Sequence, residues 1–100
     1  MRVHFERSGG LGGLLLTVSI ESDTLPVDEQ RRLRQLIDEA DFFNLPAELS
    51  DSGAAVDQFV YKVVVESADR SHSIQTTEAA APPSLQPLLD WLTRVARRKN

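Results

Sequence analysis

Hydrophobic and polar residues alternate with a period of two in four segments of the chain, which is typical of β-strands. The first two segments, residues 3–6 and 14–21, are joined by a glycine-rich stretch, so we expect a β-hairpin. The segments 58–66 and 71–77 are separated by a short turn and predict a second hairpin. One face of the last segment is wholly polar, and we expect that face to contact solvent.

Two other segments have apolar residues three and four positions apart, as in an amphipathic helix. The first helix is expected from about residue 27 to 41, and the second after Ser84, a plausible N-cap. Their apolar stripes are Leu33, Leu36, Ile37 and Ala40 in the first, and Leu85, Leu88, Leu89, Leu92, Val95 and Ala96 in the second. The predicted fold is α+β in the order ββαββα, a four-stranded antiparallel sheet with two helices packed on one face.

The composition is that of a single globular domain over residues 1–100. The chain has 41% hydrophobic and 26% charged residues, a net charge of −4 and no cysteine. The lack of cysteine excludes disulfides and thiolate metal sites, and the acidic charge disfavours nucleic acid as a partner. Because we see neither a membrane span nor a signal peptide, we expect a cytoplasmic monomer without membrane contact.

The loop between the first two predicted strands is the most distinctive stretch of the sequence. It reads Arg7-Ser8-Gly9-Gly10-Leu11-Gly12-Gly13 and contains four of the five glycines, more than a tight turn requires. These glycines lack the spacing of a nucleotide-binding loop, and a strand rather than a helix follows them. Two interpretations stay open: a loose hairpin turn, which is the more common case, or a binding loop that presents Leu11.

The predicted topology brings three connecting segments to the same end of the sheet: the glycine loop, residues 47–57 and residues 77–83. Loops on a rigid scaffold often carry function, so this end is the candidate binding end. Asp57 directly precedes a strand, where turn capping is its default role, whereas Asp51 has no obvious local role. The apolar and acidic residues of this end are Leu11, Leu49, Asp51, Val56, Asp57 and Glu78.

Other combinations of reactive residues give weaker signals. His4 and His72 lie on separate strands without a metal-binding spacing, and we interpret both as surface or core-edge residues. No nucleophile elbow accompanies the serines, so an enzyme is the least favoured class. The C-terminal cations are interpreted as a solvated helix end, with an acidic partner as the alternative. They are Arg94, Arg97, Arg98 and Lys99.

Four blocks of the sequence resemble the emfourin family: Phe5–Gly10, Leu36–Pro46, Asp57–Tyr61 and Leu88–Leu92. The resemblance implies a small bacterial inhibitor of thermolysin-family zinc metalloproteases, especially protealysin-like ones, with no cofactor of its own. It also implies that two adjacent loops block the protease. One loop would supply an aspartate to the catalytic zinc, and the other would place apolar side chains in the substrate-binding sites.

The resemblance does not assign the zinc-binding aspartate residue by residue, but the topology favours Asp51 or Asp57. The protease-binding residues expected at this end are Gly9, Gly10, Leu11, Gly12, Asp51, Val56 and Asp57. The rival is the opposite end of the sheet, where Asp23 lies beside Leu25. The alternative function is a metal-independent protein-interaction module that uses the same loop end.

Overall fold

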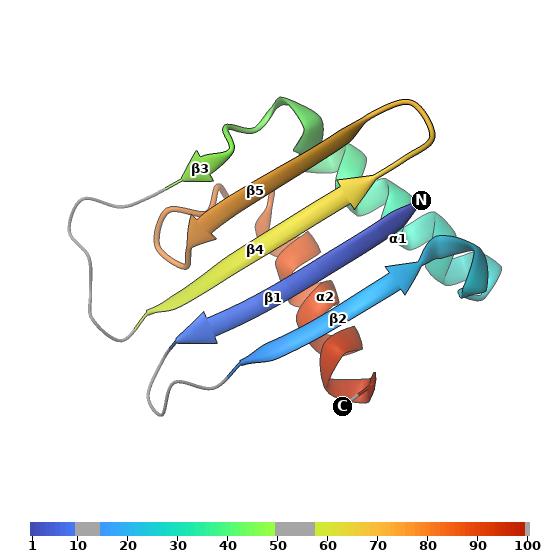
Figure 1. Ribbon diagram of the computed structural model, residues 1–100, viewed down its shortest axis with the longest axis horizontal. Helices are drawn as coiled ribbons and strands as arrows, with labels where there is room; N and C mark the ends of the chain where they lie inside the picture. The colour runs from blue at the N-terminus through green and yellow to red at the C-terminus, as the bar shows by residue number, and fades with distance from the viewer. Residues whose placement is uncertain (10–14, 50–57, 100) are drawn as a thin grey trace.

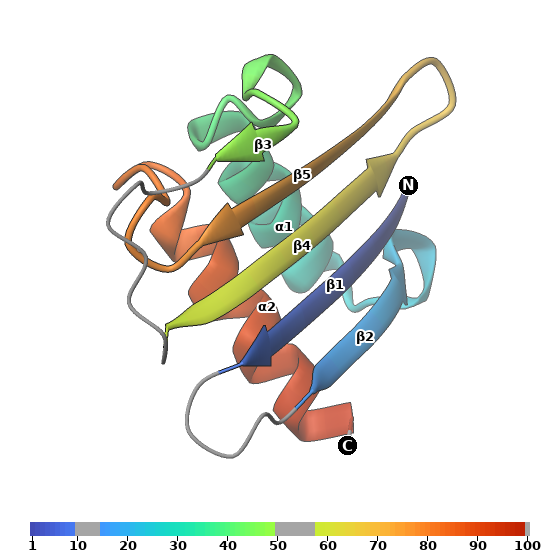
Figure 2. The same ribbon diagram turned by 60° about the vertical axis from the view of Figure 1, so that its left-hand side comes forward.

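The fold is a mixed β-sheet with two α-helices on one of its faces (Figures 1 and 2). The computed structural model describes residues 1–9, 15–49 and 58–99. The strands are β1 (Arg2–Gly9), β2 (Leu16–Glu21), β3 (Glu48–Leu49), β4 (Phe59–Glu66) and β5 (Ser71–Thr77). The helices are α1 (Val27–Glu39) and α2 (Gln86–Lys99), with short 3-10 helices η1 (Ser22–Thr24) and η2 (Phe42–Asn44).

The sheet differs from the predicted one in its number of strands and in one pairing. Its order is β2-β1-β4-β5-β3, and the pairs β1–β2, β1–β4 and β4–β5 are antiparallel, whereas β3 pairs with β5 in parallel. The expectation of four antiparallel strands was therefore wrong. The additional strand β3 has two residues, too few to show a period of two, and its pairing depends on a distant segment: the Gln75 N–H donates to the Ala47 carbonyl at 2.8 Å.

The core lies between the sheet and the helix layer, as the apolar patterns predict. Alternate strand residues point into it, and the solvent side of β5 carries only polar residues. The helices contribute their apolar stripes, which closes a two-layer structure. The buried strand residues are Val3, Phe5, Val18, Ile20, Val63, Val65 and Ile74, and they face Leu33, Leu36, Ile37, Leu85, Leu88, Leu89, Leu92, Val95 and Ala96.

Both helices form where expected, but their boundaries differ from the predicted ones. The first ends at Glu39 rather than at residue 41, because Asp41 adopts the left-handed conformation with φ 51° and stops the helical hydrogen bonding. The second begins at Gln86, and the Leu89 N–H donates to the Leu85 carbonyl at 3.1 Å, so Leu85 rather than Ser84 precedes the first helical residue. Neither helix in the described part of the chain is long and apolar enough to cross a membrane.

Candidate functional site

One end of the sheet collects the residues that flank both undescribed stretches, 10–14 and 50–57. Strands β1, β3 and β5 end there, and β2 and β4 begin there (Figure 1). The register shows this directly, because Gly9 pairs with Phe59 and the Glu78 N–H donates to the Phe59 carbonyl at 2.9 Å. The chain therefore enters and leaves both stretches at one end of the molecule, as the predicted topology requires.

The beginning of β4 is fastened to the connector that follows β5. The Phe59 N–H donates to Glu78 Oε1 at 3.3 Å, and the Ala79 N–H donates to Gln58 Oε1 at 3.1 Å. A third bond within the connector joins the Ala80 N–H to Thr77 Oγ1 at 3.3 Å. The Glu78 carboxylate thus has a hydrogen-bond partner within the fold. These bonds hold the connector against the beginning of β4.

An aromatic and cationic cluster lies on the helix-facing side of the same end. The Arg7 guanidinium stands over the Phe59 ring at 4.2 Å from the ring centre, a cation–π geometry. The Tyr61 ring lies between Phe59 and Phe5, with ring centres 6.4 and 6.1 Å away. Partial burial raises the pKa of Tyr61, while the neighbouring Arg7 opposes that shift, so the phenol is neutral at pH 7. Side-chain contacts, as well as backbone hydrogen bonds, therefore join the first hairpin to β4.

Gly9 is the only described member of the expected protease-binding set. It ends β1 with φ 93°, a conformation that favours glycine. A Cβ atom at this position would lie 3.0 Å from the Gln58 carbonyl oxygen, so the backbone of β4 also limits the space. Gly9 thus has a structural reason to be glycine. Gly10, Leu11, Gly12, Asp51, Val56 and Asp57 lie outside the described residues, and their assignment stays a prediction.

Replacing Gly9 with alanine should destabilise the fold by about 1–3 kcal/mol, because an L side chain is strained at this φ and meets the Gln58 carbonyl. Urea unfolding followed by circular dichroism measures the change. Ser8→Ala is the matched control in the same strand, and it should stay within about 0.5 kcal/mol of wild type. Equal stability of Gly9→Ala and wild type would contradict the structural role and leave ligand binding as the reason for the glycine.

At the rival end of the sheet, Asp23 and Leu25 differ in their exposure to solvent. Asp23 is exposed in η1, beyond the end of β2 that is remote from the glycine loop. Leu25 is only 9% exposed and belongs to the hydrophobic core, and its carbonyl accepts a bond from Gln30 Nε2 at 2.8 Å. Leu25 therefore supports the fold, and this end does not present the pair of acidic and apolar side chains that the sequence suggested.

Leu15 is a residue of the candidate end that sequence reasoning missed. It immediately precedes β2 and its side chain is 66% exposed, the largest fraction for a big apolar residue in the described part of the chain. In the alternating pattern of residues 14–21, Leu15 falls on the same face as Thr17, and only its exposure in the fold distinguishes it. An exposed leucine directly beside the glycine loop adds apolar surface to this end.

The histidines have partners within the fold. The His4 ring contacts Ser19 Oγ at 2.8 Å on the neighbouring strand, and His72 Nε2 donates to the Leu45 carbonyl at 2.7 Å. Strand β4 separates the two strands that carry them. Within residues 1–9, 15–49 and 58–99, no three His, Asp or Glu side chains come close enough together to hold a metal ion.

Comparison with known proteins agrees with this architecture. The model of the Emfourin family matches residues 5–93, which extends from within β1 to within α2. This chain belongs to the Emfourin family. A solved structure described as emfourin (M4in) from Serratia proteamaculans, an M4 family peptidase inhibitor, has the same fold. Its TM-score is 0.50 at 20% sequence identity, over 93% of this chain and 87% of that one. Among curated proteins, none matches this chain.

Proposed function

We propose that this emfourin-family chain is a reversible inhibitor of an M4 family (thermolysin-like) zinc metalloprotease. The family match over residues 5–93 carries the proposal. The protein from Serratia proteamaculans, whose fold this chain shares, is described as an M4 family peptidase inhibitor. Family membership also favours an inhibitor over an enzyme.

The inhibitory end, in this proposal, is the sheet end to which residues 10–14 and 50–57 are attached. Three observations support this choice over the opposite end. The strands that flank both stretches meet at this end, and Leu15 adds exposed apolar surface beside the first stretch. At the opposite end, Leu25 is buried in the core. A partner seated here would meet residues 10–14 and 50–57, whose described flanking residues Gly9 and Phe59 are paired in the sheet.

The mechanism that we propose needs one carboxylate and one or two apolar anchors. Asp51 or Asp57 would place a carboxylate oxygen on the protease zinc at about 2.0–2.2 Å, in the position that water or substrate would take. Leu11 and Val56 would enter the substrate-binding sites and be desolvated there, with roughly 1.5–3 kcal/mol from each fully buried side chain. A carboxylate on the zinc contains no scissile bond, so the inhibitor is not cut.

The test is to titrate a thermolysin-like protease with the intact chain and to measure residual activity on a small peptide substrate. We expect inhibition that is competitive with substrate, because chain and substrate would share one site. Binding of the chain to the same protease after its zinc has been removed should be much weaker, since the carboxylate would have no ligand.

Two outcomes would change the assignment. Equal binding to the zinc-free and zinc-loaded protease would favour the metal-independent interaction module. No inhibition of several thermolysin-like proteases would contradict the proposed function. The competition experiment separates both outcomes from inhibition at a remote site, which would lower activity without competing with substrate.

A further inference from the structure

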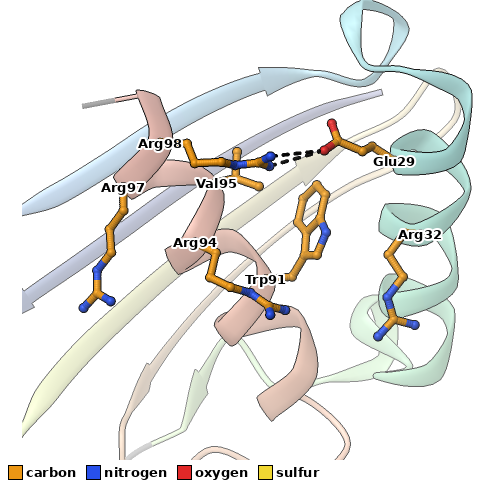
Figure 3. Close-up of a pocket in the computed structure, with 7 residues that line it drawn as sticks. All are labelled: Glu29, Arg32, Trp91, Arg94, Val95, Arg97 and Arg98. Atoms are coloured by element: carbon orange, nitrogen blue, oxygen red, sulfur yellow. Dashed lines mark hydrogen bonds and ion pairs between the residues drawn. The ribbon is translucent and has the colours of Figure 1, made fainter.

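A groove of about 540 Å³ runs between α1 and α2 and is built from residues that the proposed inhibitory end does not use. Figure 3 shows Trp91 standing between the two helices, with Arg94 of α2 and Arg32 of α1 on either side of it. The groove has an apolar wall and a charged rim, and its volume lies within the usual range of binding pockets. Its lining residues are Glu29, Arg32, Trp91, Arg94, Val95, Arg97 and Arg98.

The charge of this groove is opposite to that of the chain. Four arginines and one glutamate line it, a formal charge of +3, whereas the whole chain carries −4. Arg98 is paired with Glu29 at 3.3 Å. Arg32 has a long bond to the Gln35 amide oxygen at 3.4 Å, and within the described part of the chain neither Arg32 nor Arg94 has a carboxylate partner.

The helix dipole accounts for only part of this cluster. Cations in the last turn of a helix are stabilised by its negative end, which explains Arg97 and Arg98. Arg94 lies before that turn, and Arg32 lies in the middle of α1, where the dipole gives no such advantage. The placement of Arg32 and Arg94 on either side of one indole therefore results from the way the helices pack.

We propose that the groove between α1 and α2 binds an acidic peptide segment of a partner protein. Carboxylates of that segment would pair with Arg32 and Arg94, and an apolar side chain between them would rest on the small exposed part of Trp91. The guanidinium groups stand on different helices and point in different directions (Figure 3), so they suit several spaced carboxylates better than one small anion. This proposal does not rest on protease inhibition.

Nucleic acid suits the groove less well than an acidic peptide. Trp91 is only 8% exposed, so it offers too little open surface for a base to stack on. A peptide needs only the arginine charges and the small exposed part of the indole.

Trp91 makes the groove directly measurable, because it is the only tryptophan of the chain. The intact protein would be titrated with a capped Glu-Asp-Leu-Glu-Asp peptide while tryptophan emission is recorded. We expect a saturable change in emission, with affinity that falls as salt is added, since the contacts are exposed ion pairs. The double variant Arg32→Gln/Arg94→Gln should bind the peptide about tenfold more weakly.

The control is Arg31→Gln/Arg34→Gln, which removes the same charge from exposed positions of α1 that do not line the groove. It should bind the peptide as wild type does. The proposal is overturned if the peptide leaves the emission unchanged, if both double variants bind equally, or if a lysine-rich peptide or a single-stranded oligonucleotide gives the same response. Circular dichroism verifies that both double variants are folded, and inhibition of the protease is a separate readout.

Discussion

Changing the aspartate proposed to bind the protease zinc into asparagine is expected to weaken protease inhibition by at least about 30-fold. Loss of one partner from a buried charged contact costs about 2 kcal/mol or more, and each 1.4 kcal/mol is a factor of ten in affinity. Asparagine keeps the shape of the side chain but removes the negative charge that a zinc ion attracts. We expect this loss in either Asp51→Asn or Asp57→Asn, measured as the inhibition constant against a thermolysin-like protease.

The matched control for this prediction is Asp23→Asn, which makes the same chemical change at the other end of the sheet. Asp23 is exposed in η1, so the variant should fold and inhibit as wild type does. If Asp23→Asn lost inhibition while the Asp51 and Asp57 variants retained it, the inhibitory end would be the opposite one. If all three variants inhibited fully, a carboxylate on the zinc would not be the mechanism.

Phe5→Ala is expected to cause the largest loss of stability among the substitutions considered. Phe5 is fully buried in the central part of β1, where it pairs with Val18 on one side and Val63 on the other. Removing a buried phenylalanine side chain costs about 3–5 kcal/mol, through lost burial and the cavity left behind. Domains of this size are stable by only about 5–15 kcal/mol. The midpoint of thermal unfolding should therefore fall by at least about 12 °C.

Val27→Ala is the surface control for this measurement. Val27 begins α1 and is 60% exposed, so its truncation should change the unfolding free energy by less than about 0.5 kcal/mol. A Phe5→Ala variant as stable as the control would mean that the core repacks around the missing ring. Phe5 also touches Tyr61, whose ring contacts Phe59 at the candidate end, so the variant should inhibit more weakly at temperatures where it is still folded.

The two binding surfaces proposed for this protein have different chemical characters. The sheet end combines glycine, apolar residues and acids, and it suits a metal-containing cleft. The groove between α1 and α2 is basic and would attract an acidic chain. Because different side chains form them, the aspartate variants and the Arg32/Arg94 variant should each affect one readout and leave the other unchanged.

The local elements, the layer arrangement and the family could all be predicted from the pattern of residues along the chain. The side chains that face the core recur every two residues in a strand and every three to four in a helix. The two hairpins, the two helices and the polar face of β5 could therefore be predicted from the order of apolar and polar residues. The order of these elements also placed the glycine loop and residues 47–57 at one end of the sheet, and the described flanking residues lie there.

Features that depend on residues far apart in the chain could be recognised only in the assembled fold. Strand β3 exists because β5 offers a free edge to Glu48 and Leu49, and two residues carry no pattern of their own. Leu25 is buried because η1 turns it toward the core. The groove around Trp91 arises where two helices pack, so Arg32 and Arg94 line one groove despite 61 intervening residues. The spacing of residues along the chain reports only local periodicity. A free sheet edge, the burial of one side chain and a groove between helices arise only when the layers assemble.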